Sequence, residues 1–220
     1  MNQAVAAEGR LKITEIFRSL QGESSSVGWP TVFVRLTGCP LRCTYCDTAY
    51  AFHGGQWMSK ARILEAVAAF NTHHVCVTGG EPLAQKNCIA LLSALCDAGY
   101  HVSLETSGAL DIAHVDPRVR RVVDLKTPNS GEMHRNHWPN LECLSSHDEL
   151  KFVIGDRADY EWARQALVEH ALNQRCTVLF SPSQGLLEPG QLADWLLADQ
   201  LPVRFQLQLH KVLWGNVPGR

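Results

Sequence analysis

The chain has 220 residues, of which 45% are hydrophobic and 19% are charged, and its formal net charge is −2. This length suits a single globular domain over residues 1–220, with a core that needs no disulfide staples. No apolar run approaches the roughly 20 residues that span a bilayer, and no basic surplus attracts phosphates, so composition argues against membrane and nucleic-acid partners. The first ten residues lack the apolar segment of a secretory leader, and we expect a soluble cytoplasmic protein.

Strand-like and helix-like runs alternate along the chain. The expected strands are 13–18, 31–36, 74–78, 101–105, 121–125, 150–154, 176–180 and 203–209, and the expected helices are 59–70, 82–98, 158–172 and 191–198. Ser59 and Asp156 are predicted helix caps, Gly99 is a predicted helix end, and 127–140 has little helical pattern. This alternation predicts a parallel sheet with helices outside it. A Rossmann sheet is not favoured, because no G-x-G-x-x-G follows the first strand.

Three cysteines have the spacing C-x3-C-x2-C, at Cys39, Cys43 and Cys46. Iron–sulfur clusters ordinarily take four Cys thiolates, so three thiolates can hold three irons and leave the fourth open to a substrate or cofactor. A structural zinc site would instead need four ligands, and His53 is only a distant fourth. The remaining cysteines lie in apolar or helical context and are expected in the core or at the surface. They are Cys76, Cys88, Cys96, Cys143 and Cys176.

This cysteine spacing resembles the signature of radical S-adenosylmethionine (SAM) enzymes. The segment VTGGEP at 77–82 is similar to the Gly-Gly-Glu motif that binds the SAM amino group in those enzymes. Its glycines would let the backbone approach a ligand and adopt positive φ; the alternative is an ordinary strand-to-helix turn with Pro82 at the helix start. The resemblance implies an open, partial parallel β/α barrel of about six core strands with reduced helices.

A narrower resemblance rests on six ordered segments. They are LQGE (20–23), VFVRL (32–36), CDT (46–48), LETSG (104–108), ELKFV (149–153) and QLHK (208–211). Together they resemble the 7-carboxy-7-deazaguanine synthase family over about 13–211. The resemblance implies a carbon–nitrogen lyase of queuosine and 7-deazapurine biosynthesis, which contracts the ring of 6-carboxy-5,6,7,8-tetrahydropterin with loss of ammonia. It also implies a [4Fe-4S] cluster, SAM and Mg²⁺ as cofactors, a homodimer, and an electron donor such as flavodoxin.

The same resemblance assigns roles to individual residues. The cluster ligands would be Cys39, Cys43 and Cys46, with Thr48 as a ligand of Mg²⁺. Substrate contacts are expected from Leu20, Gln21, Gly22, Glu23, Arg35 and Thr78. SAM contacts are expected from Tyr45, Cys46, Asp47, Gly80, Asp124, Leu125, Lys126, Ser181, Pro182, Ser183 and Gln184. The family has Ser-Pro where this chain has Asp124-Leu125, and usually Gln where it has Ser181, so these transfers are the weakest.

Elementary chemistry supports several of these roles. A carboxylate at Glu23 can accept two N–H bonds from a pterin edge. Arg35 lies in an apolar strand and therefore needs a buried anionic partner or a pocket, where its fork suits a carboxylate. A neutral hydroxyl at Thr48 binds Mg²⁺ only with help from water and substrate oxygens. Glu105 and His210 are expected on the same face and could transfer protons as catalytic groups.

Three other classes of protein remain open from the sequence. A glycyl-radical-enzyme activase shares the cysteine spacing but has no need of a pterin pocket. A radical-SAM enzyme with another substrate would share the whole cofactor site. A non-catalytic metal-binding module would use the cysteines for zinc alone.

Overall fold

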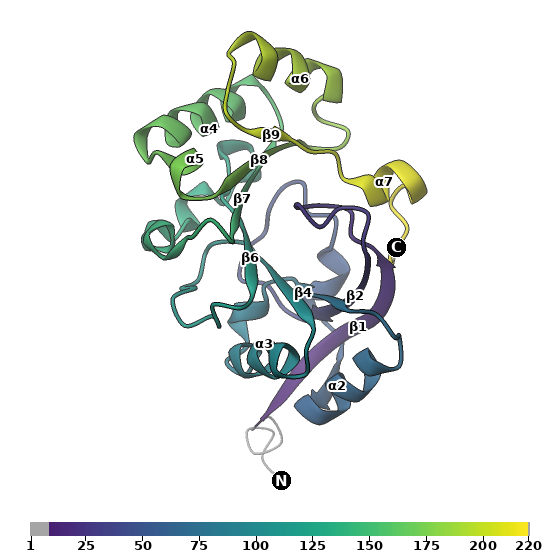
Figure 1. Cartoon of the computed structure of the whole chain (residues 1–220). Coiled ribbons are helices and arrows are strands. Elements are labelled where there is room, and N and C mark those ends of the chain that lie inside the picture. The colour runs from purple at the N-terminus through teal and green to yellow at the C-terminus, as the bar shows by residue number, and fades with distance from the viewer. Residues whose placement is uncertain (1–8, 220) are drawn as a thin grey trace.

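One open sheet of nine strands organises residues 9–219, the part of the chain that the computed structural model describes (Figure 1). The strand order is β3-β1-β2-β4-β5-β6-β7-β8-β9. β1 pairs antiparallel with β2 and β3, whereas all neighbours from β2 to β9 are parallel. The expected open, partial barrel is confirmed. The strands are β1 Arg10–Leu20, β2 Pro30–Leu36, β3 Gln56–Ser59, β4 His74–Gly79, β5 His101–Thr106, β6 Arg120–Asp124, β7 Glu149–Ile154, β8 Thr177–Pro182 and β9 Arg204–Phe205.

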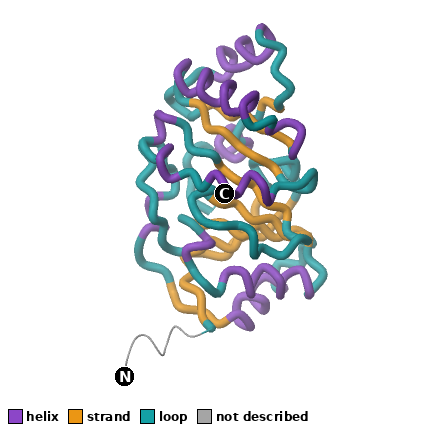
Figure 2. The backbone as a smooth tube through the Cα atoms, turned by 90° about the vertical axis from the view of Figure 1, so that its left-hand side faces the viewer, coloured by secondary structure: helices purple, strands orange, loops and turns teal. Residues whose placement is uncertain are grey.

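Helices lie at both ends of the sheet, and shorter helical segments lie beside the strands between those ends (Figure 2). The α-helices are α2 Lys60–Ala68, α3 Cys88–Asp97, α4 Arg157–Glu169, α5 Leu172–Arg175, α6 Pro189–Ala198 and α7 Leu209–Trp214. The 3₁₀ helices are η1 Ala49–Phe52, η2 Pro82–Ala84, η3 Pro128–Ser130, η4 Met133–Arg135 and η5 Trp138–Cys143. Short 3₁₀ turns thus replace a crossover helix between β6 and β7, as the sequence of 127–140 predicts. Within residues 9–219 no helix is both long and apolar enough to cross a bilayer.

The predicted helix caps are confirmed. Ser59 accepts a hydrogen bond from Arg62 N at 3.3 Å, and Asp156 accepts one from Asp159 N at 2.9 Å. Gly99 follows α3 with φ of +86°, a left-handed backbone that glycine adopts without a Cβ penalty. These short-range signals need no tertiary context, which explains why they can be read from the sequence.

Two sequence predictions were wrong. The predicted helix 82–98 is interrupted, because η2 ends at Ala84 and α3 begins only at Cys88. The predicted last strand 203–209 shrinks to the two residues of β9, and α7 begins where that strand was expected to end. Gln206 N still donates to the Phe180 carbonyl of β8 at 3.0 Å, while its side-chain amide accepts from Ser24 N at 2.7 Å and donates to the Ser24 carbonyl at 2.8 Å. Beyond it, Leu209 N donates to the Gly22 carbonyl at 2.9 Å, so the chain continues along the segment after β1.

Side chains of β7 alternate between two environments, as in any strand. Leu150 and Phe152 are buried in the hydrophobic cluster that α4 and α6 cover. Glu149 and Lys151 have the opposite orientation and contact the segment after β1 from inside the curved sheet. A second cluster packs β2, β4 and β5 against α2 and α3. The outer faces therefore hold the fold together, and the inner face is left for polar groups.

Candidate active site

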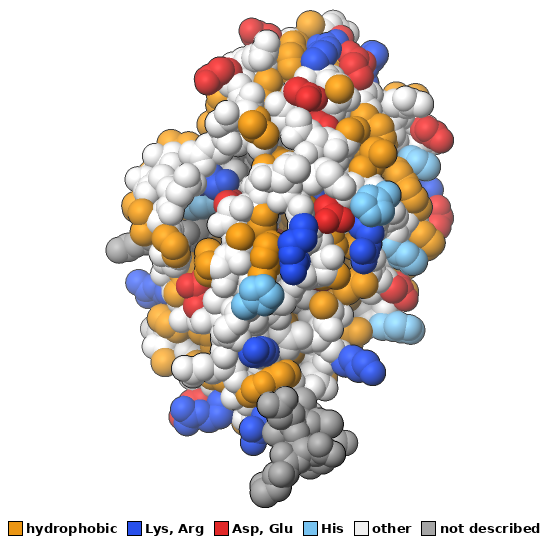
Figure 3. Space-filling view, turned by 180° about the vertical axis from the view of Figure 1, so that it is seen from behind, with side chains coloured by type: hydrophobic (Ala, Val, Ile, Leu, Met, Phe, Trp, Pro, Cys, Tyr) orange, Lys and Arg blue, Asp and Glu red, His pale blue; other side chains and the backbone are white. Residues whose placement is uncertain are grey.

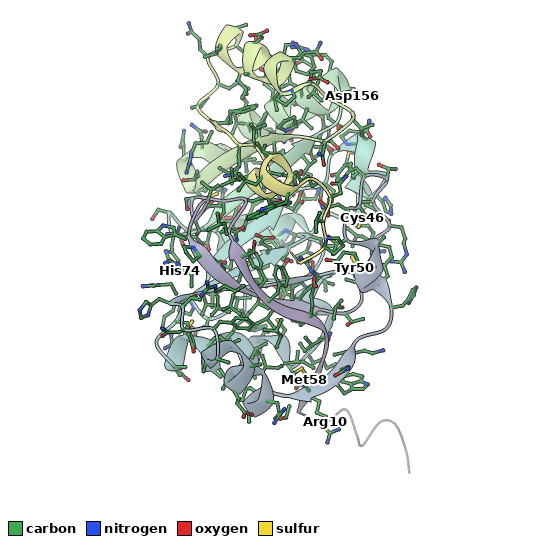
Figure 4. The ribbon with its side chains drawn as sticks, turned by 90° about the vertical axis from the view of Figure 1, so that its right-hand side faces the viewer. Arg10, Cys46, Tyr50, Met58, His74 and Asp156 are labelled. Carbon is green, nitrogen blue, oxygen red and sulfur yellow. The ribbon has the colours of Figure 1, made fainter. Side chains whose placement is uncertain are left out.

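A cavity of about 570 Å³ lies at the carboxyl ends of the parallel strands. Viewed from behind, the surface is hollowed beside the C-terminal segment, and basic and acidic side chains meet there (Figure 3). Cys46 and Tyr50, both in the cavity wall, lie at one edge of the molecule, and His74, where β4 begins, lies at the opposite edge (Figure 4). Predicted site residues in the wall are Leu20, Gln21, Gly22, Glu23, Arg35, Cys39, Cys43, Tyr45, Cys46, Asp47, Thr48, Thr78, Gly80, Glu105, Asp124, Lys126, Ser183, Gln184 and His210.

The cysteine loop presents three free, partly exposed thiols to this cavity, at Cys39, Cys43 and Cys46. Thr44 anchors the loop to η3, donating from Oγ1 to the Asn129 carbonyl at 2.6 Å. Burial raises the pKa of Cys43 to about 11 and also raises that of Cys39. Since iron binds the thiolate, the metal itself must supply the positive charge that favours ionisation.

The thiols are spread around the cavity wall. Among residues 9–219, no three His, Cys, Asp or Glu side chains converge on one point as ligands of a single metal ion would. A cluster makes a different demand, because each of its irons takes its own thiolate. The loop is therefore suited to three ligands of a [4Fe-4S] cluster.

Gly79 and Gly80 are needed for close packing. A Cβ on Gly79 would lie 2.4 Å from the Leu36 carbonyl oxygen, and one on Gly80 would lie 2.4 Å from that of Gly38. Neither glycine has a positive φ, so that part of the sequence interpretation was wrong. The two glycines let β4 approach the start of the cysteine loop, which places the Gly-Gly segment beside Cys39.

Glu81, the acidic residue of the Gly-Gly-Glu motif, is fully buried and faces protein donors. Its carboxylate accepts hydrogen bonds from Leu83 N at 2.9 Å, Ser107 N at 2.7 Å and Thr106 Oγ1 at 2.9 Å. A carboxylate with this many donors is already satisfied. Its role is to tie the end of β4 to the end of β5, which fixes two walls of the cavity.

Glu23 lies at the centre of a buried polar group. Its carboxylate accepts from Lys151 Nζ at 2.5 Å and from Gln208 Nε2 at 2.8 Å. Burial alone would raise the pKa of Glu23, but the Lys151 ammonium outweighs it and holds that pKa at about 2. Glu23 is therefore an ionised acceptor at neutral pH.

Glu105 lies in the same wall but has only neutral donors. Gln21 Nε2 donates to it at 3.2 Å and Thr78 Oγ1 at 3.4 Å. Burial, and then the negative charge of Glu23, raise the pKa of Glu105. The pKa of Glu23 is thus lowered while that of Glu105 is raised. A pair of carboxyls whose pKa values are moved apart in this way can serve as an acceptor and a proton donor.

Arg35 has both the anionic partner and the pocket that its apolar strand demands. Its Nε donates to Glu15 at 2.7 Å, and its guanidinium lies 5.7 Å from the Phe17 ring centre and 5.8 Å from that of Tyr50. Tyr50 also donates to Glu15 at 2.8 Å. Because Glu15 occupies the Nε side, the guanidinium is held with a fixed orientation at the cavity wall.

Asp124 carries a buried oxygen with no hydrogen-bond partner among the described residues, Oδ1. Its Oδ2 pairs with Lys126 Nζ at 2.9 Å, and that ammonium lies 5.9 Å from the Tyr45 ring centre. Burial opposes the charge of Lys126, yet Asp124 raises its pKa. An unsatisfied acceptor beside a cation and an aromatic ring suits a polar ligand with its own donors, as SAM is.

The C-terminal segment, residues 208–219, forms one side of the cavity. Leu209 N donates to the Gly22 carbonyl at 2.9 Å, and Lys211 Nζ pairs with Asp47 at 2.6 Å. Burial alone would raise the pKa of Asp47, but Lys211 holds it at about 2. Residues 215–219 continue along the cavity wall. The C-terminal segment therefore joins the residues after β1, at Gly22, to the end of the cysteine loop, at Asp47.

Comparison with known proteins agrees with this geometry. Residues 33–175 match the Radical SAM superfamily. A 7-carboxy-7-deazaguanine synthase from Chlorobaculum tepidum is 47% identical, over 96% of this chain and 97% of the relative. One from Koribacter versatilis is 46% identical, over 93% and 97%. This chain belongs to the 7-carboxy-7-deazaguanine synthase family. Its fold is similar to the crystal structure of QueE from Escherichia coli, with a TM-score of 0.76 and 23% identity over 95% of this chain and 99% of that one.

Membership of the synthase family brings a [4Fe-4S] cluster and SAM with it. Three residues expected to contact SAM do not line the cavity. Leu125 packs into the hydrophobic cluster under α4, and Ser181 and Pro182 are buried at the end of β8. Strand alternation turns the Leu125 side chain outward, so a contact from it would come from its backbone. Their contacts with SAM stay predictions.

Several residues of the synthase cavity carry no role in the sequence interpretation. These are Phe17, Tyr50, Ser107, Lys151, Gln208, Lys211 and the tail 215–219, together with Glu15, which pairs with Arg35 of the wall. Lys151 had a visible signal, since it interrupts the apolar run of a parallel strand whose neighbours are Leu150 and Phe152. Glu15 and Lys211 had none, because their partners are far along the chain.

Proposed function

We propose that this chain converts 6-carboxy-5,6,7,8-tetrahydropterin into 7-carboxy-7-deazaguanine, acting as a carbon–nitrogen lyase that releases ammonia. The observation that carries the proposal is that one cavity joins the three-cysteine loop to Glu23, Arg35 and Glu105. The names of the full-length relatives support the same product.

Binding would begin at the two ends of the substrate. The ionised carboxylate of Glu23 accepts N–H donors from the pterin ring, while the remaining guanidinium nitrogens of Arg35 suit its carboxylate. Gln21 and Thr78 lie between these ends, bonded to Glu105. Charge at both ends fixes the register of the ring relative to the cysteine loop.

Cofactors would bind on the opposite wall. Cys39, Cys43 and Cys46 would hold the cluster, and Tyr45, Gly80, Asp124 and Lys126 would line the SAM site. When bound, the cluster and SAM supply a carbon-centred radical that removes a hydrogen atom from the substrate. Mg²⁺ would bind at Thr48, with water and substrate oxygens as its other ligands. Thr48 Oγ1 donates to Asp47 at 2.8 Å, which keeps its lone pairs directed away from that carboxylate.

Proton transfer would fall to Glu105 and His210. Burial raises the pKa of Glu105, which favours its protonated form, and burial lowers the pKa of His210, which favours its neutral form. Departure of ammonia needs a proton donor near the ring, and these two side chains line the same cavity. The C-terminal segment limits the entry of water.

The wider setting is also part of the proposal. A homodimer and an electron donor such as flavodoxin are proposed from the family resemblance, and a single domain over the whole chain is proposed from its length. Eight free cysteines support a reducing compartment such as the cytoplasm.

The test is an anaerobic assay of cluster-reconstituted protein with SAM, dithionite, Mg²⁺ and 6-carboxytetrahydropterin. We expect 7-carboxy-7-deazaguanine, and we expect Cys43→Ala to lose both iron and product. Cys96→Ala is the matched control, because Cys96 is a partly buried thiol outside the cavity wall. Cleavage of SAM without the deazapurine product would refute the substrate while leaving the radical-SAM assignment in place.

A further inference from the structure

Lys151 is a buried ammonium that the proposed function does not yet use. It projects from β7 into the cavity, and its side chain is 11% exposed. A buried ammonium is costly unless it is paired, so its contacts indicate what it does. Its Nζ lies 2.5 Å from Glu23 Oε2 and 3.8 Å from Asp124 Oδ2.

Two of the cavity lysines, Lys126 and Lys151, divide Asp124 and Glu23 between them. Lys126 pairs with Asp124 at 2.9 Å, which leaves Lys151 for Glu23. Glu105 receives only the neutral donors Gln21 and Thr78. Lys151 therefore contacts only one of the two carboxyls: it holds Glu23 as an ionised acceptor, while burial and the charge of Glu23 raise the pKa of Glu105.

Charged and titratable groups face Glu23 from several elements. Lys151 comes from β7, Glu105 from β5, and His210 from α7, next to the neutral donor Gln208. Of these, Lys151 makes the charged contact, and burial of Glu23 would otherwise favour its protonated form. A protonated Glu23 could accept fewer N–H donors, because one oxygen would carry a hydrogen.

We propose that Lys151 is a positioning residue, which holds Glu23 as a hydrogen-bond acceptor and so selects a 2-amino-4-oxopyrimidine ring over its 2,4-dioxo analogue. This inference rests on the proposed function for the identity of the ring. The 2-amino ring offers two adjacent N–H donors to the carboxylate. The dioxo ring places a carbonyl oxygen there, which the carboxylate repels. A site built around an acceptor rejects a ligand that lacks the donor.

Binding can be measured on the cluster-reconstituted protein with SAM, using 6-carboxypterin and 6-carboxylumazine as fluorescent probes. In Lys151→Met we expect the Kd for 6-carboxypterin to rise about 10- to 100-fold, as for a lost hydrogen bond to a charged group. The Kd for 6-carboxylumazine should change little, so the selectivity falls. Lys151→Arg should retain selectivity. Lys86→Met is the control, because Lys86 is exposed and outside the cavity.

The pH dependence of 6-carboxypterin affinity is a second readout, because it would not change if Lys151 had a purely structural role. Without Lys151 the pKa of Glu23 should rise, so 6-carboxypterin affinity should weaken as pH falls from about 7.5 to about 5.5. The wild-type protein should show no such change from Glu23, whose pKa is about 2. For 6-carboxytetrahydropterin, the variant should raise KM by a larger factor than it lowers kcat.

A double-mutant cycle remains informative even if Lys151→Met fails to fold with an unpaired Glu23. Glu23→Gln and the double variant Glu23→Gln/Lys151→Met lack that buried charge. If Lys151 acts only through Glu23, both should bind 6-carboxypterin equally within about 2-fold. Additional weakening in the double variant would overturn the inference, as would unchanged selectivity in Lys151→Met or absence of wild-type 6-carboxypterin binding. Wild-type binding and selectivity without deazaguanine formation would instead refute the proposed function and leave the role of Lys151 supported.

Discussion

Replacing Gly80 with alanine tests whether glycine packing positions the cysteine loop. The added Cβ would lie 2.4 Å from the Gly38 carbonyl oxygen and 2.7 Å from Cys39 Cβ. Gly80 cannot retreat freely, because Gly80 N donates to Leu36 at 3.1 Å and Glu81 N donates to Gly38 at 2.8 Å. Restoring normal contact therefore requires the start of the loop to move by about 1 Å.

The expected cost has two parts. Overpacking at a tight contact destabilises a protein by about 1–3 kcal/mol, which urea unfolding measures. A shift of about 1 Å between reacting groups can lower a rate on the order of 100-fold, so we expect that loss in reductive cleavage of SAM. The assay is 5′-deoxyadenosine formation by the reconstituted, dithionite-reduced protein, with iron and sulfide determined per chain.

Gly190→Ala provides the matched control. A Cβ on Gly190, in the first turn of α6, would meet no atom within 4 Å. That variant should keep wild-type iron content and SAM cleavage, and should gain up to about 1 kcal/mol in stability. If Gly80→Ala matched Gly190→Ala in both stability and SAM cleavage, the packing argument would be refuted.

Three further substitutions test separate features. Asp148→Asn should cost about 3 kcal/mol in urea unfolding at neutral pH, because it unpairs buried Arg121, 2.6 Å away. Burial opposes the ionised form of Asp148, but Arg121 outweighs it and lowers the pKa of Asp148. The stability difference between wild type and variant should therefore be full above about pH 4 and disappear as pH falls further. A pH-independent difference in stability would contradict this. Gly22→Ala should weaken 6-carboxypterin binding at least about 10-fold, since its Cβ would lie 2.1 Å from His210 Nδ1; unchanged affinity would show that α7 can move at no cost. Asp156→Ala should cost about 1 kcal/mol by removing the α4 cap, with activity per folded chain unchanged.

Much of the fold is visible in the sequence because it depends on local signals. The parallel strands are visible in the sequence as short apolar runs. Ser59 and Asp156 mark the starts of two helices, and Gly99 marks the end of another. The boundaries that failed depend on distant partners. The side chain of Gln206, just after β9, bonds Ser24, a contact across 182 residues that no local pattern could reveal.

The site divides in the same way. The cysteines and the Gly-Gly-Glu segment are contiguous motifs, so they could be identified directly. The structural role of Glu81 in that motif was not predicted: it ties two strand ends together, because its partners Thr106 and Ser107 lie at the end of β5. Charge pairing was the least predictable feature, as Lys151 and Glu23 are 128 residues apart.

The position of the C-terminal segment has a practical consequence for anyone who produces this protein. Residues 215–219 form part of the cavity wall, whereas Arg10, at the start of β1, lies at the end of the molecule remote from Cys46 (Figure 4). An affinity tag on the C-terminal side would extend from residues of the cavity wall and would compete with substrate for the cavity. A tag on the N-terminal side would not contact the cavity wall, so it is the better arrangement for kinetic measurements.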